Sequence, residues 1–254
     1  MQRQGSFADL EAFGQRRRTR RERFLGQMEA IVPWEQWVAL VESHYPDGRR
    51  GRKPVGCERM LRMYLLQVWF HLSDEACEDA VLDSRAMQRF VGIDMMSEQV
   101  PDATTLLKFR HLLEGEGLGE RMLAELVSIL DERGIIMRGG SIVDATFVES
   151  PSSTKNRERS RDPEAHQAKK GNNWHFGYKA HAGVDAGTGL VHTVEVTAAN
   201  VSDVAVAPSL LRPDDEFCYA DAGYTGIGKR PEVRGDPTLS GVEWRVARRR
   251  SKVP

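Results

Sequence analysis

The pattern of apolar residues changes at Gly139-Gly140, and this change limits the possible folds more than any other feature of the chain. Before it, apolar residues recur every three or four positions, which is typical of amphipathic helices. After it come short runs of β-branched residues separated by turn residues, which indicate strands. We therefore expect an α+β protein with an all-helical domain at residues 1–135 and a mixed-sheet α/β domain at residues 136–254.

Capping residues place several helices in the first half. Ser73 is a suitable N-cap, and it is followed by acidic residues in the first turn of the expected helix. The segment Pro101–Thr105 opens another helix, and a third is expected over residues 119–133, ending at Gly134. Short helices joined by tight turns fit a helix-turn-helix module, although a plain helical core is an equal alternative.

The second half contains strands, a hairpin and one short helix. The expected strands cover residues 141–148, 174–184, 190–197, 216–220 and 244–247, and the helix covers residues 204–211. Residues 151–173 are polar and lack an apolar period, so we expect a long mobile loop there. A parallel pairing of strands 141–148 and 216–220 requires a long crossover, and the helix supplies it. A strand, a hairpin, a helix and a parallel strand in this order are typical of the beginning of an RNase H-like sheet.

Composition excludes several classes of protein. No apolar run approaches the roughly 18 residues of a membrane span. The first ten residues contain no apolar stretch, so we expect no secretory signal. The three cysteines match no disulfide or zinc spacing, which favours a reducing cytoplasm. Residues 1–53 and 136–254 are net basic whereas residues 54–135 are net acidic, so local patches could bind nucleic acid.

Two aspartates are the leading candidates for catalysis. Asp144 lies within an apolar strand, where a carboxylate is costly unless it is paired, hydrogen-bonded or bound to metal. Asp221 ends another strand. If these strands are adjacent and parallel, the two side chains can converge and hold Mg²⁺ for phosphodiester chemistry. The alternative is that each aspartate only caps a turn.

Two further patterns give weaker candidates. His175, His181 and His192 lie in the hairpin and could form a metal cluster with Asp185, although ordinary hydrogen-bonding or DNA-facing histidines are favoured. The segment 223–230 nearly satisfies the P-loop spacing, but Arg230 stands where Ser or Thr is needed. A glycine-rich turn that brings cations near phosphates is the better interpretation.

Several motifs in order resemble the bacterial insertion-sequence-five family of DDE transposases. They are Val143–Thr146, the segments 151–156 and 162–181, Gly183–Asp185, Leu190–His192, Ala198–Asp203 and Ala220–Tyr224. The segments 87–93 and 101–110 are similar to the InsH-type helical domain of that family. The resemblance covers nearly the whole chain from about Phe7.

This resemblance implies an RNase H-like catalytic domain with two Mg²⁺ ions, for which Mn²⁺ can substitute, and an Asp-Asp-Glu triad. Asp144 matches the first acid of the triad and Asp221 the second. The implied reaction is cleavage at the terminal inverted repeats, followed by attack of the freed 3′-hydroxyl on target DNA. The implied partners are double-stranded DNA and further copies of the chain, as a homodimer or higher multimer. The implied location is the bacterial cytoplasm, in association with the nucleoid.

Eleven residues are expected to contact DNA, most of them in basic loops. They are Arg49, Arg50, Arg52, Lys53, Lys155, Lys169, Lys170, His175, Lys179, Lys229 and Arg230. The arginine run at residues 16–23 is either a solvated helix face or an arm that contacts phosphates.

The chain departs from the family pattern near its C-terminus. Residues 244–247 match the strand before the third acid, and Glu243 precedes that strand, so it does not match the third acid. We therefore expect a C-terminally truncated transposase with an incomplete catalytic domain and a partly uncovered sheet face. Two alternatives stay open: an inactive DNA-binding or inhibitory fragment of such a transposase, and a metal-dependent nuclease without strand transfer.

Overall fold

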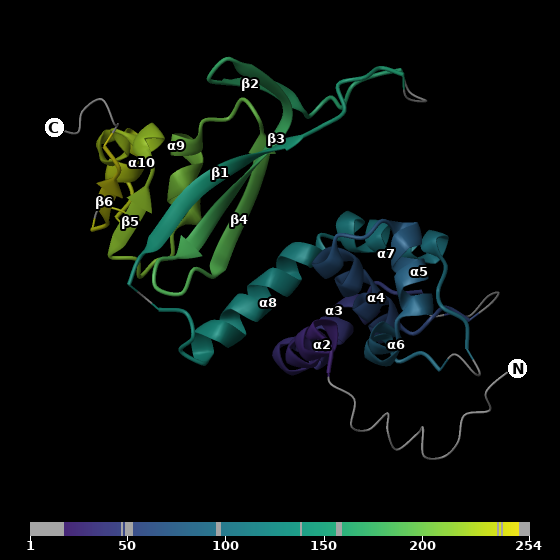
Figure 1. Ribbon diagram of the computed structural model, residues 1–254. Helices are drawn as coiled ribbons and strands as arrows, with labels where there is room; N and C mark the ends of the chain where they lie inside the picture. Colours follow the sequence, from purple (N-terminus) through teal and green to yellow (C-terminus); the bar gives the residue numbers. More distant parts are fainter. Residues whose placement is uncertain are drawn as a thin grey trace, which may run out of the picture. The chain divides into compact units, whose positions relative to one another are not determined.

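The computed structural model describes residues 18–46, 48, 53–94, 98–137, 139–155, 159–237, 239 and 241–248. The chain forms two compact units, Met1–Leu126 and Val127–Pro254, which are considered separately below. The described part of the first unit is helical, and that of the second contains a six-stranded sheet (Figure 1). The expected α+β class is confirmed. None of the described helices combines the length and the apolar character that a membrane span requires.

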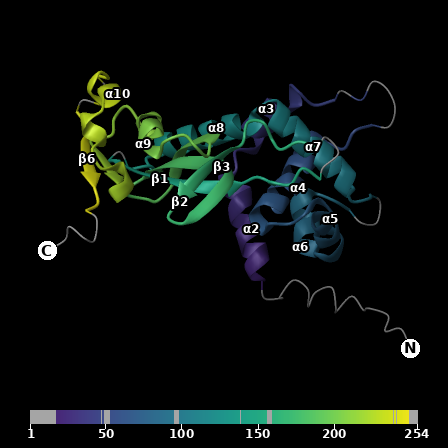
Figure 2. The ribbon, with the colours of Figure 1, turned by 90° about the horizontal axis from the view of Figure 1, so that it is seen from above.

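The described helical part of the chain contains seven helices, the last of which continues past Leu126 into the second unit, and four of the others contact one central helix. The seven helices are α2 (Arg20–Ile31), α3 (Trp34–Glu42), α4 (Cys57–Phe70), α5 (Asp74–Asp83), α6 (Arg85–Val91), α7 (Ala103–Gly115) and α8 (Leu118–Glu132). Helix α4 supplies Met60, Leu61, Met63 and Leu66, which are fully buried. It touches α3, α5, α6 and α7, so it forms the centre of the bundle seen in Figure 2.

Local capping explains where these helices begin and end. Ser73 is the N-cap of α5, as expected, and its hydroxyl accepts a hydrogen bond from the Ala76 amide at 3.1 Å. Asp102 caps α7 by accepting one from the Thr105 amide at 2.6 Å. Beyond α8, Gly134 takes a left-handed conformation with φ of +64°, which confirms the expected stop.

The second unit is built on a mixed sheet. Its strands are β1 (Ser141–Glu149), β2 (His166–Lys170), β3 (Asn173–Asp185), β4 (Val191–Ala198), β5 (Phe217–Ala220) and β6 (Glu243–Val246). The order is β2-β3-β1-β5-β6, with β4 also pairing with β3. Strands β1, β2 and β4 run antiparallel to β3, whereas β1–β5 and β5–β6 are parallel. The expected hairpin and the expected parallel neighbour of β1 are both present.

Two expectations for this unit are wrong. The segment 151–173 is not an unbroken loop, because β2 lies within it and pairs with the start of β3. All but one residue of β2 are exposed, so the strand carries no apolar alternation that the sequence could reveal. The helix expected at residues 204–211 is shorter: α9 (Asp203–Val206) gives way to the 3₁₀ turn η1 (Ala207–Leu210), which contains Pro208.

The two faces of the sheet differ in what covers them. On one face Val143, Cys218 and Ala220 pack in a core with α9, η1 and the later turns η2 (Ala222–Tyr224), η3 (Ile227–Lys229) and α10 (Pro231–Arg234). On the other face Ile142, Val148, Val196 and Tyr219 are exposed. Within the described residues of this unit, that face therefore carries exposed apolar side chains.

Candidate active site

Asp144 and Asp221 lie side by side at the junction of β1 and β5. Ile142 pairs with Tyr219 and Val143 with Ala220 in the parallel ladder. The two aspartates are the next residues along each strand, so the same register places them on one face of neighbouring chains. Neighbouring strands lie about 4.8 Å apart, which brings the two carboxylates within reach of one ion.

The setting of Asp144 differs from the one expected. Val143 points into the core with 1% of its surface exposed, whereas Asp144 is exposed on the opposite face of β1. Its Oδ1 accepts a hydrogen bond from the Ala145 amide at 2.8 Å. The cost of burying a carboxylate therefore does not apply to Asp144. Its position beside Asp221 is the feature that indicates chemistry.

Asp221 also serves as a turn cap, which was the alternative role considered for it. Its Oδ1 accepts a hydrogen bond from the Gly223 amide at 2.8 Å, and its backbone carbonyl accepts one from the Tyr224 amide at 3.2 Å. A Cβ at position 223 would lie 2.8 Å from that same Oδ1. The glycine therefore leaves room for the carboxylate, and the turn fixes its orientation.

The donor set fits a divalent cation bound through oxygen. Mg²⁺ is held by one or two carboxylates together with water and substrate phosphates, and Asp144 and Asp221 supply such a pair. Within the described ranges, no group of three or more His, Cys, Asp or Glu side chains is placed to hold a metal ion. A metal site at this position could therefore draw two carboxylates from the described part of the unit.

The alternative cluster of hairpin histidines with Asp185 does not form. His181 is fully buried, with its Nε2 2.9 Å from Thr197 Oγ1, and burial lowers its pKa. His192 Nε2 lies 2.8 Å from Ser141 Oγ. Asp185 is bound by Arg212 at 3.2 Å and by Thr188. Ser141, Asp215 and Arg212 connect His192 to Asp185, whereas His181 bonds to Thr197 elsewhere. The side chains are thus held by hydrogen bonds and ion pairs within the protein and are not grouped around a metal position.

Glu243 lies away from the aspartate pair. It opens β6 opposite Phe217, whereas Asp221 follows the other end of β5. Its carboxylate accepts a hydrogen bond from Arg245 Nε at 2.9 Å, and this bond lowers the pKa of Glu243. Glu243 therefore does not complete the pair in this structure, in agreement with its position in the sequence pattern.

Comparison with known families agrees with this geometry. A family model described as a transposase domain (DUF772) matches residues 13–112, and one described as a transposase DDE domain matches residues 137–243. The chain belongs to the insertion-sequence-five-like DDE transposases. No solved structure matches this transposase.

The β2–β3 hairpin carries four of the eight described residues that were expected to contact DNA in this transposase, namely Lys169, Lys170, His175 and Lys179. Lys169 and Lys170 are exposed near its tip, and Lys155 is exposed on the segment before it. Trp174, which the sequence did not single out, is 66% exposed, and Lys169 Nζ lies 5.9 Å from its ring centroid. Its sequence signal was its place at the start of the strand expected over residues 174–184, directly after the polar segment 151–173.

Two other residues of the hairpin are engaged within the protein. His175 stacks on Phe147 with ring centroids 4.4 Å apart, and its Nδ1 lies 3.0 Å from Glu149. Lys179 is buried, and its Nζ donates to Asp203 at 2.7 Å and to the Val201 carbonyl at 2.8 Å. The ammonium of Lys179 is therefore used in an ion pair and a hydrogen bond within the protein. This contradicts its expected role as a phosphate contact.

The remaining predicted DNA contacts lie in both units. Lys229 is exposed and Arg230 half-buried in the turns after Asp221. Lys53 is exposed in the helical unit, whereas Arg49, Arg50 and Arg52 lie outside the described residues.

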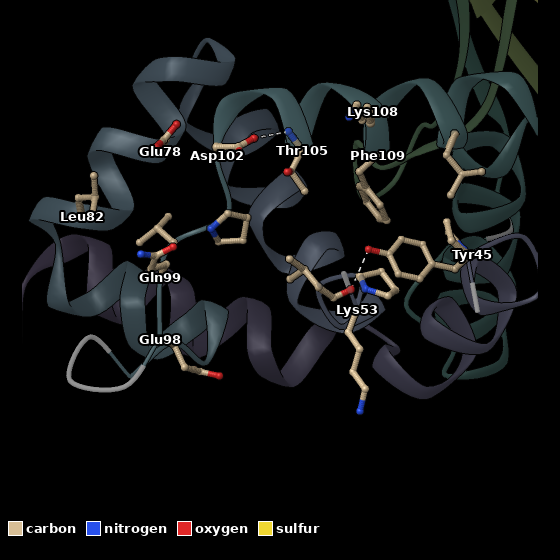
Figure 3. Close-up of a pocket in the computed structure, with 16 residues that line it drawn as sticks. Tyr45, Lys53, Glu78, Leu82, Glu98, Gln99, Asp102, Thr105, Lys108 and Phe109 are labelled. Atoms are coloured by element: carbon tan, nitrogen blue, oxygen red, sulfur yellow. Dashed lines mark hydrogen bonds between the residues drawn. The ribbon is translucent and has the colours of Figure 1, made fainter. Parts of the chain in front are cut away.

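The helical unit of the transposase also contains a cavity of about 990 Å³ beside Lys53 (Figure 3). Its wall includes Glu78 and Asp102, but these carboxylates accept hydrogen bonds from the backbone amides of α7. Tyr45 on the same wall donates to the Val55 carbonyl at 2.8 Å. These three polar side chains are therefore used in holding the helices together.

Proposed function

We propose that this transposase binds the terminal inverted repeats of an insertion sequence and uses Asp144 and Asp221 to hold Mg²⁺ for strand cleavage and strand transfer. The observation that carries the proposal is the β1–β5 register, which brings the two aspartates together from residues far apart in the sequence. The bound ion would polarise the phosphodiester and favour attack on it. Water would be the first nucleophile and the freed DNA 3′-hydroxyl the second.

The protein's own part in this chemistry is to set the position of the carboxylates. The ladder fixes the separation of β1 and β5, and the turn at Gly223 orients Asp221. Both side chains are exposed, so a DNA strand can approach them from the open face of the sheet. Backbone hydrogen bonds would then set the distance between the Asp144 and Asp221 carboxylates. This backbone would need little rearrangement during the reaction.

Binding of DNA is supported by the exposed cations together with Trp174. Lys169 and Lys170 can neutralise phosphates, and the aromatic face of Trp174 can stack on a base. Lys53, Lys155, Lys229 and Arg230 are proposed as further phosphate contacts, and Arg49, Arg50 and Arg52 stay predictions. Assembly as a homodimer or higher multimer is proposed from the family resemblance alone.

A second candidate function is DNA binding without cleavage, by which the chain would inhibit a complete transposase. It is favoured because the described residues contain no group of three acids placed for metal binding. In this case the helical unit and the β2–β3 hairpin would occupy end DNA, and Asp144 and Asp221 would not support cutting.

The test compares the chain with its Asp144→Asn and Asp221→Asn variants on a labelled duplex that carries the terminal repeat of its own element. Asp83→Asn is the matched control, because Asp83 is an exposed aspartate on α5 in the helical unit. We expect wild type and Asp83→Asn to cut in Mg²⁺ or Mn²⁺, and the other two variants to bind without cutting.

Each other outcome has a clear meaning. Cutting by Asp144→Asn at the wild-type rate would refute the assignment of the site. Protection of the repeat by wild type without any cutting would favour the second candidate function. Cutting without joining of a pre-cut end to target DNA would indicate a nuclease that lacks strand transfer.

A further inference from the structure

Strand β4 lies at an edge of the sheet and pairs with β3, and none of the other described strands pairs with it (Figure 1). The Ala199 amide donates to the Gly177 carbonyl at 3.0 Å, which extends the β3–β4 ladder by one position. In an antiparallel pair, every second residue exchanges backbone hydrogen bonds with its neighbour, and the residues between direct their N–H and C=O groups away. Counting back from Ala199, the backbone polar groups of Ala198, Val196 and Val194 therefore point to the free edge.

This edge lacks the features by which proteins usually prevent an edge strand from pairing with another chain, such as lysine and proline residues. Strand β4 contains no lysine, arginine or proline, and its one carboxylate, that of Glu195, accepts a hydrogen bond from the Ser209 hydroxyl. Val194 and Val196 are 45% and 62% exposed. The strand therefore presents free backbone groups and exposed apolar side chains at the same residues.

The sequence of β4 is compatible with antiparallel pairing to the same strand of a second copy, in which a twofold axis sets one residue opposite itself. With Val196 on the axis, Val194 lies opposite Ala198, and all three outward-facing residues exchange backbone hydrogen bonds. Glu195 then lies opposite Thr197, so no like charges face each other.

Other registers of this pairing are less favourable. With Glu195 on the axis, two carboxylates would face each other. With Val194 on the axis, the pairing would run into the start of β4, where the ladder with β3 is irregular. Axes beyond Val196 leave Val194 past the end of the partner strand.

We propose that two copies of this transposase associate through antiparallel pairing of their β4 edges, with Val196 opposite its own counterpart at the twofold axis. The inference deepens the proposed function and rests on one part of it, the homodimer, for which it names the shared surface. The exposed valines of the two copies would adjoin across the axis, which removes part of their apolar surface from water.

This arrangement leaves both candidate active sites open. Asp144 and Asp221 follow the paired residues of β1 and β5, and β3 lies between these strands and β4. An axis that joins two sheets edge to edge is perpendicular to them, so the open faces of both copies point to the same side. Two DNA ends could therefore reach the two aspartate pairs from one side of the dimer.

The test measures the molar mass of the full chain by light scattering over a range of concentrations, with and without duplex DNA. Wild type is expected to form a dimer. Val196→Lys should weaken it by roughly 10-fold or more, because two like charges would face each other at the axis. Val148→Lys is the matched control: Val148 is also an exposed valine on the open face, but it lies on β1, and this variant should keep the wild-type dimer. Circular dichroism should be unchanged in both variants, since both side chains are exposed.

A cysteine variant tests the register and does not depend on weakening the dimer. Directly opposite residues that exchange backbone hydrogen bonds have Cα atoms about 5.5 Å apart, a separation that a disulfide can span. Val196→Cys should therefore form a disulfide between two copies when copper phenanthroline oxidises the thiols, whereas Val148→Cys should not. The native cysteines are buried, so wild type is the baseline.

The outcomes separate this inference from the proposed function. A dimer that Val196→Lys keeps would overturn the edge pairing but not the homodimer. Equal loss of the dimer in Val148→Lys would also overturn it, because the copies would then meet through the open face. Loss in Val196→Lys alone, without the disulfide in Val196→Cys, would overturn the proposed register. A wild-type chain that stays monomeric with and without DNA would overturn both the edge pairing and the homodimer, whereas the roles of Asp144 and Asp221 would still be decided by the cleavage assay.

Discussion

Replacement of Arg212 by methionine is expected to lower the free energy of unfolding of the sheet unit by about 3 kcal/mol. Arg212 Nη2 lies 3.2 Å from Asp185 Oδ1 and 3.3 Å from Asp215 Oδ1, and both carboxylate side chains are fully buried. Asp215 also accepts a hydrogen bond from the Ser141 hydroxyl at 2.5 Å. The network joins the start of β1, the end of β3 and the segment before β5. It therefore supports the pairing that sets Asp144 beside Asp221.

The magnitude follows from what the two carboxylates keep when the guanidinium is lost. Breaking a buried ion pair by removing one partner costs roughly 3–5 kcal/mol. Asp185 keeps hydrogen bonds from Thr188 Oγ1 at 2.6 Å and from the Thr188 amide at 2.8 Å. Asp215 keeps the bond from the backbone amide of residue 212 at 2.9 Å, which methionine also provides. These remaining donors place the expected loss at the lower end of the range.

Urea unfolding of the full chain, followed by circular dichroism, measures this loss. Arg133→Met, an exposed arginine in the same unit, is the control and should leave stability nearly unchanged. In the double variant Arg212→Met with Asp185→Asn, one unpaired charge is removed, so part of the lost stability should return. A loss no larger than that of Arg133→Met would refute the idea that Arg212 stabilises buried carboxylates.

Three further predictions concern single positions. Gly223→Ala should weaken Mn²⁺ binding with little change in circular dichroism, because its Cβ would displace Asp221 Oδ1; unchanged affinity would count against that geometry. Burial lowers the pKa of His192 below 6.5, so the stability it confers is complete above pH 6.5 and is lost as the pH falls through the lower folded pKa. Melting temperatures at pH 7.5 and 5.5 should therefore differ less in His192→Gln than in wild type, and equal differences would contradict this account. Asp102→Ala should lower the free energy of unfolding of the helical unit by about 1 kcal/mol in urea titrations, because α7 loses its N-cap, and an unchanged midpoint would exclude this role.

Much of the fold was predictable because its signals are local. The cap at Ser73 and the stop at Gly134 act within a few residues, so the sequence displays them directly. The alternation in β3 and β4 likewise predicts the hairpin. The positions of Asp144 within an apolar strand and of Asp221 at the end of another made them candidates, and the family motifs then matched them to the first two acids of the triad.

The geometry of the candidate site required the tertiary structure, because it depends on contacts between distant segments. The pairing of β1 with β5 joins residues more than seventy positions apart, and only this register makes neighbours of Asp144 and Asp221. Packing against α9 decided that Lys179 is paired with Asp203 and that the Tyr224 hydroxyl lies buried. Burial and long-range pairing result from the whole chain folding, so the sequence predicted which residues to consider and the fold decided what each one contacts.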